Sequence, residues 1–228
     1  MALKNQDSMN TFLSMKESRH TLLWLTIFAI AMAFLESVVV LYLRKIYYPH
    51  GFHFPLALIS VDIFVAEFFR EIATILMIVC LSVLTAKMFW QRFAIFMILF
   101  GVWDIFYYVW LKLLLNWPIS LFDWDVLFLI PVPWIGPVIA PVIVSITMIS
   151  AGLLILRLYA RACTFKPTLL SIILTAAGIG CVLFTFIRDT NATMHFHDPV
   201  PFWFWLFAAG VILMGTGFLA AYFRLTKS

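Results

Sequence analysis

Residues 93–115 read FAIFMILFGVWDIFYYVWLKLLL, an apolar run long enough to cross a lipid bilayer as a single helix. Within this run only Asp104 and Lys112 carry charge. A carboxylate in the middle of a membrane helix is costly unless another group pairs with it, and such residues commonly mark a functional site. The stretch therefore indicates a membrane protein that also holds a polar site.

The same pattern recurs along the chain. A spanning helix needs about 20 mainly apolar residues, and this criterion predicts six spans, at residues 21–43, 63–86, 93–115, 137–157, 168–188 and 202–223. The composition agrees, because 64% of the 228 residues are hydrophobic and 11% are charged. We therefore expect an all-α polytopic membrane protein whose residues 1–228 form one transmembrane bundle.

That bundle divides into four parts. We expect residues 1–20 to be a cytoplasmic N-terminal segment, 21–116 to hold three charge-bearing spans, 117–136 to form an outer segment rich in proline and tryptophan, and 137–228 to hold the last three spans. Four prolines lie between residues 131 and 141. Because proline removes an amide donor and clashes with the preceding turn, we expect residues 126–136 to be broken or re-entrant before the fourth span.

Basic residues predict the orientation of the bundle. Lys and Arg gather before the first span, between the second and third, between the fourth and fifth, and after the last. Positive charge is retained in cytoplasmic loops, so we expect both termini in the cytoplasm, and the compact loops suit a bacterial cytoplasmic membrane. The net charge of +4 reflects this topology, so no nucleic-acid partner is expected. On the outer side, Arg44 and Lys112 are expected to extend toward the interface.

Acidic residues mark the first three spans and are missing from the last three. Glu67, Arg70 and Glu71 share one helix face, because residues three and four apart are neighbours on a helix. If the three faces converge, they form an acidic pocket in the outer half of the bundle. The predicted ligand- or ion-binding residues are Glu36, Glu67, Arg70, Glu71, Asp104, Tyr108 and Lys112.

Four acids in this set meet two bases, so a proton or a bound cation could supply the missing charge. The alternative is structural: Arg70 pairs with Glu36 or Asp104 to join helices, and Lys112 only extends to the interface. No catalytic residue and no cofactor can be assigned.

Histidines lie near the ends of the spans and in the outer loops. Without histidines at membrane depth, a b-type haem is disfavoured. A weaker possibility is a transition-metal site, because imidazole suits such ions, if the first and third outer loops meet. Its ligands would be His50, His53, His195 and His197.

Small residues four apart predict close helix contacts in the last three spans. These pairs are Ala176 with Gly180 and Gly217 with Ala221. The uncharged half therefore suggests a scaffold.

Three functions remain open from the sequence. The chain could be a binding or transport component for a small molecule or ion, an integral membrane enzyme acting on a lipophilic substrate, or an accessory subunit that assembles with partner membrane subunits. Each has the lipid bilayer as its surroundings.

Overall fold

The fold, a computed structural model, describes residues 15–190 and 197–226. Six helices are long and apolar enough to cross a membrane, which confirms the predicted all-α polytopic class and identifies an integral membrane protein. These helices are α2 (Met15–Tyr47), α3 (Val61–Thr85), α4 (Phe89–Leu115), α5 (Ile139–Ala160), α6 (Leu169–Ile187) and α8 (Phe204–Thr226).

The interruption predicted before the fourth span is also confirmed, and it takes the form of a β-hairpin. Strands β1 (Trp124–Phe128) and β2 (Trp134–Pro137) pair in antiparallel register, with Asp125 opposite Gly136. The prolines of this segment exclude a helix. Pro141, in contrast, lies in the first turn of α5, where a missing amide donor costs little.

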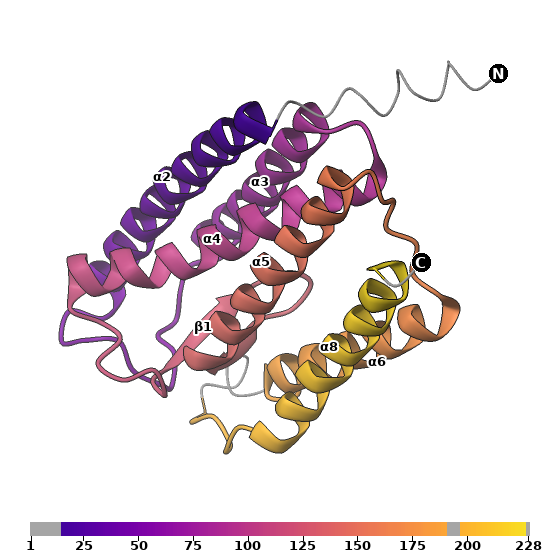
Figure 1. Cartoon of the computed structure of the whole chain (residues 1–228). Helices are drawn as coiled ribbons and strands as arrows, with labels where there is room; N and C mark the ends of the chain where they lie inside the picture. The colour runs from indigo at the N-terminus through magenta and orange to yellow at the C-terminus, as the bar shows by residue number, and fades with distance from the viewer. Residues whose placement is uncertain (1–14, 191–196, 227–228) are drawn as a thin grey trace.

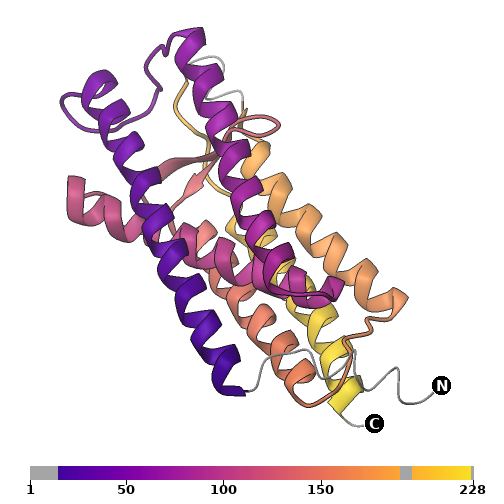
Figure 2. The ribbon, with the colours of Figure 1, turned by 90° about the horizontal axis from the view of Figure 1, so that it is seen from above.

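The helices form two groups, which Figure 1 shows as α2 to α5 on one side and the α6–α8 pair on the other. In the first group, α2, α3 and α5 each pack along α4, whereas α2 and α3 make no extensive contact with each other. Seen from above in Figure 2, the hairpin strands lie between α2 and α3. The hairpin therefore fills part of a space that the helices leave open.

In the second group, glycines allow α6 and α8 to approach closely. A Cβ atom added at Gly178 would lie 2.5 Å from the carbonyl oxygen of Gly210, and one at Gly217 would lie 2.8 Å from that of Ser171. The predicted close contact at Gly217 is confirmed. The prediction for Gly180 is wrong, because nothing lies within 4 Å of an added Cβ there and the residue is exposed.

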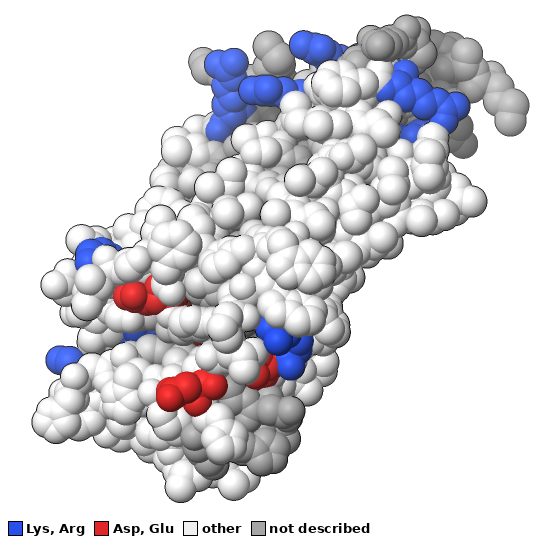
Figure 3. Space-filling view, turned by 90° about the horizontal axis from the view of Figure 1, so that it is seen from below, with Lys and Arg blue, Asp and Glu red and all other residues white. Residues whose placement is uncertain are grey.

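Charged residues are distributed unevenly along the bundle. Figure 3 shows a group of Lys and Arg side chains at one end, while the visible Asp and Glu side chains lie in the opposite half together with further Lys and Arg side chains. Within the described residues, the chain ends Met15 and Thr226 lie at one end of the bundle, because six helices alternate in direction. We call the opposite end, which carries β1 and β2, the hairpin end.

Candidate functional site

A cavity of about 610 Å³ lies at the hairpin end. Its walls come from α2, α3, α4, the loop between α2 and α3, and the hairpin. Five of the predicted site residues line it, and they come from three different helices: Glu36, Glu67, Arg70, Glu71 and Asp104. The helix faces that carry the acidic residues therefore converge on one space.

Three of these carboxylates lie at a similar depth. Glu71 follows the start of α3 by ten residues, while Glu36 and Asp104 precede the ends of α2 and α4 by eleven. At about 1.5 Å per residue, each lies about 15 to 17 Å along its helix from the hairpin end. The carboxylates thus form one polar layer within the bundle.

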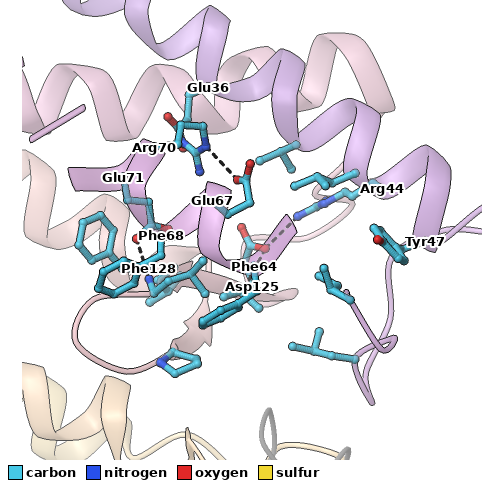
Figure 4. A pocket seen from close by; sticks show the side chains of 18 of the residues that line it. Glu36, Arg44, Tyr47, Phe64, Glu67, Phe68, Arg70, Glu71, Asp125 and Phe128 are labelled. Atoms are coloured by element: carbon cyan, nitrogen blue, oxygen red, sulfur yellow. Dashed lines mark hydrogen bonds and ion pairs between the residues drawn. The ribbon is translucent and has the colours of Figure 1, made fainter. Parts of the chain in front are cut away.

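Arg70 is the cationic centre of this layer. Its Nε donates to Glu67 at 2.8 Å, one turn away on α3, and its Nη1 pairs with Glu36 across the space between α3 and α2. Figure 4 shows these side chains meeting at the cavity wall. Thr74 adds a longer contact to Glu36 of 3.5 Å. One guanidinium therefore serves two carboxylates, which leaves this group with a net negative charge.

Glu71 contacts the hairpin instead of a base. Its Oε2 accepts a hydrogen bond of 2.8 Å from the backbone amide of Leu129, which follows β1 directly. The side chain is buried, and the contact joins α3 to the segment between the two strands. Among the residues that the structure describes, Glu71 forms no ion pair.

Asp104 is likewise engaged by a neutral donor. The hydroxyl of Ser145, on α5, donates to its Oδ2 at 2.8 Å. Ser145 is itself buried, so this bond lies inside the α4–α5 contact. No ion pair involving Asp104 occurs in residues 15–190 and 197–226. Glu71 and Asp104 are therefore the two cavity carboxylates in the layer that lack a cationic partner.

An ion pair that the sequence did not indicate, between Arg44 and Asp125, forms part of the cavity wall. Arg44 was expected to extend to the interface, but its side chain is only 8% exposed and its Nη2 lies 2.8 Å from Oδ1 of Asp125 on β1. The guanidinium carbon lies 4.2 Å from the ring centroid of Phe52 and 3.7 Å from that of Trp117. The expectation for Arg44 is wrong, because these rings and the hairpin carboxylate cover it.

Burial and pairing act in opposite directions on Asp125. Burial raises the pKa of this carboxyl to about 6, and the Arg44 guanidinium lowers it by a smaller amount. Two polar atoms of the pair, Arg44 Nη1 and Asp125 Oδ2, are buried without a hydrogen-bond partner. The Asp125 carboxyl is also engaged by the Tyr108 side chain on α4 and by the amide of Val126, so the pair joins α2 and α4 to the hairpin.

Two predicted site residues do not line the cavity. Lys112 donates to the backbone carbonyl of Pro118 at 2.9 Å, near the end of α4. Tyr108 is buried with its ring near that of Trp117, 6.4 Å between centroids. The neighbouring Tyr107 lines the cavity instead and lies within electrostatic range of both Glu36 and Asp125. The face of α4 toward the cavity thus holds Asp104 and Tyr107.

The structure describes three of the four predicted histidine ligands. His50 and His53 are exposed in the loop after α2, His197 is exposed before α8, and His195 lies outside the described residues. In the described part of the chain, no group of three or more His, Cys, Asp or Glu side chains is close enough to hold a metal ion. A metal site in these loops stays a prediction.

Comparisons with known protein families, with characterised proteins and with solved structures find no match to this chain. The candidate function therefore depends on the geometry of the cavity.

Proposed function

We propose that this protein is a membrane binding component for a small organic cation, acting in its capture or transport, and that the cavity at the hairpin end is the binding site. The charge of the lining residues carries this proposal. The described residues that line the cavity include five carboxylates and two guanidinium groups: Glu36, Glu67, Glu71, Asp104 and Asp125 against Arg44 and Arg70.

Such an imbalance is costly in a low-dielectric surrounding, because each unpaired ion loses its hydration. A cation bound in the cavity would offset that cost. Glu71 and Asp104 are the favoured contacts, since each uses one oxygen for a neutral donor and has no basic partner among the described residues.

The size and lining of the cavity favour an organic ligand. Small-molecule sites have volumes of about 300 to 1,000 Å³ and are mostly apolar with a few polar groups, and the value of about 610 Å³ falls within that range. Phe68 and Tyr107 contribute aromatic rings to the wall. Aromatic faces attract organic cations.

Binding to the purified protein tests the proposal. We expect 2-phenylethylamine, a cation at pH 7.5, to raise the melting temperature and to bind in calorimetry. The neutral 2-phenylethanol and the anion phenylacetate should do neither. Replacement of Glu71 by Gln or Asp104 by Asn should weaken binding by about tenfold or more, because a hydrogen bond to a charged group contributes about 1.5 to 3 kcal/mol.

Asp62→Asn is the matched control. Asp62 lies on α3, as Glu71 does, but it is exposed and does not line the cavity. Equal binding of the cation and the neutral alcohol, or equal loss in Asp62→Asn and Glu71→Gln, would contradict the proposal.

A further inference from the structure

The cavity has two zones along α3, and they differ in polarity. Val61 and Phe64, on the first turn, line the part near the hairpin end, while Glu67, Arg70 and Glu71 line the deeper part. From Val61 to Glu71 the helix rises about 15 Å. The charged layer therefore lies at one end of an elongated space.

The shallow zone is apolar on its other sides as well. The loop before α3 contributes Leu58 and Ile59, and α2 contributes Leu43. Leu58 and Val61 are 76% and 77% exposed. These two side chains are therefore open at the rim of the cavity and offer apolar contact area to a ligand.

The Arg44–Asp125 pair does not add charge to this zone. Its two side chains are 8% and 3% exposed, and the opposite charges lie 2.8 Å apart. The rings of Phe52 and Trp117 cover the guanidinium. The pair is buried and neutral as a whole, so the shallow zone offers a ligand mainly apolar side chains.

From this division we infer that the ligand is an amphiphilic monocation, with one ammonium group held at the Glu71 and Asp104 layer and a hydrocarbon part lying against the apolar rim. The inference rests on the proposed cation site and adds the chemical class and the orientation of its ligand. The apolar part contributes affinity in proportion to the area that it buries.

A series of amines tests this class, with free concentrations measured by equilibrium dialysis because long amines partition into detergent. The probes are n-butylamine, n-octylamine and 1,8-diaminooctane. We expect n-octylamine to bind at least about tenfold more tightly than n-butylamine, since each buried methylene adds affinity. The diamine should bind more weakly than n-octylamine, because its second ammonium would enter the apolar zone.

The variant Phe64→Ser should reduce the affinity for n-octylamine severalfold and leave that for n-butylamine unchanged. Phe69→Ser is the matched control, because Phe69 lies on the same helix, is 62% exposed and does not line the cavity. Its affinities for both amines should equal those of the wild type.

The outcomes separate the two proposals. Equal affinities for n-butylamine and n-octylamine, or tighter binding of the diamine, would overturn the amphiphile inference while leaving the cation site intact. If no amine binds, or if Glu71→Gln binds all three as the wild type does, the cation site itself is refuted.

Discussion

The two helix groups of this protein share close glycine contacts but differ in their polar links. In the α2–α5 group, polar side chains link the elements: Arg70 to Glu36, Arg44 to Asp125, and Glu71 to the amide of Leu129. Glycines bring backbones together in both groups, at Gly101 and Gly152 between α4 and α5 and at Gly178 and Gly217 between α6 and α8, but only the first group adds these polar links. Lipid tails give no hydrophobic drive for helix association, so close packing is one way to join helices and polar links are another. The first group uses links that leave an open cavity, and the second leaves little space.

The largest loss of stability should come from breaking the buried Arg44–Asp125 ion pair of the α2–α5 group. Arg44→Met removes the cation and leaves Asp125 buried and uncompensated. Removing one partner of such a pair costs about 3 kcal/mol or more, which we expect as a large fall in melting temperature at pH 7.5. The double variant Arg44→Met with Asp125→Leu should recover much of the loss. If Arg44→Met is as stable as the wild type, the ion pair does not contribute to the stability of the fold.

The next effect tests the glycine contacts of the α6–α8 pair. Gly178→Val places a side chain where an added Cβ would lie 2.5 Å from the Gly210 carbonyl oxygen. Overpacking of this kind costs about 1 to 3 kcal/mol, measurable as a lower melting temperature.

Gly180→Val is the control for that change, because nothing lies within 4 Å of its Cβ position. It should be close to neutral. Equal destabilisation by the two variants would mean that helix propensity, not contact between α6 and α8, sets the cost. Amine binding should not depend on Gly180→Val, since neither glycine lines the cavity.

The pH dependence of stability should differ between variants of the α2–α5 group and variants of the α6–α8 pair. The pKa of Asp125 is about 6 in the folded protein, above its ordinary value of 3.8. The folded state therefore holds this proton more tightly than the unfolded state, so the contribution to stability is fully present below about pH 4 and is lost as the pH rises through about 6.

The measurement is the difference in melting temperature between the wild type and Asp125→Asn, followed from pH 4 to 8. The melting temperature of the wild type should rise relative to that of Asp125→Asn as the pH falls through about 6. A shift of the opposite sign would mean that Arg44 outweighs burial and lowers the pKa of Asp125. Gly178→Val should show no such change relative to the wild type.

The smallest effect concerns one hydrogen bond between α2 and α4. The indole Nε1 of Trp110 donates to the carbonyl of Ile30 at 3.1 Å. Trp110→Phe should therefore cost about 1 kcal/mol beyond the loss of ring area. Trp103→Phe is the matched control, because it removes an indole Nε1 that is buried without a hydrogen-bond partner. If both variants lose the same stability in chemical denaturation, the Trp110 bond contributes nothing.

The comparison also shows which parts of the molecule the sequence could predict. The six spans follow from length and apolar composition, which depend only on local residues. The convergence of Glu36, Glu71 and Asp104 on one cavity was predictable in outline, because the acidic residues within the predicted spans are confined to three consecutive spans.

Helix rotation and long-range pairing were not predictable in the same way. Tyr107 and Tyr108 are adjacent, and only the packing of α4 against α2 selects Tyr107 for the cavity. Gly178 contacts α8 and Gly180 does not, although both belong to one small-residue run. Arg44 and Asp125 are 81 residues apart, and their meeting depends on a hairpin that a proline-rich apolar segment does not specify.

The hairpin has a consequence for biogenesis. Its Asp125 and Leu129 are made after α2, α3 and α4, yet they pair with Arg44 on α2 and Glu71 on α3. Arg44 and Glu71 are therefore synthesised before their partners on the hairpin. A nascent chain that stops before residue 124 lacks both links, so the cavity at the hairpin end is completed only after the ribosome has passed the middle of the message.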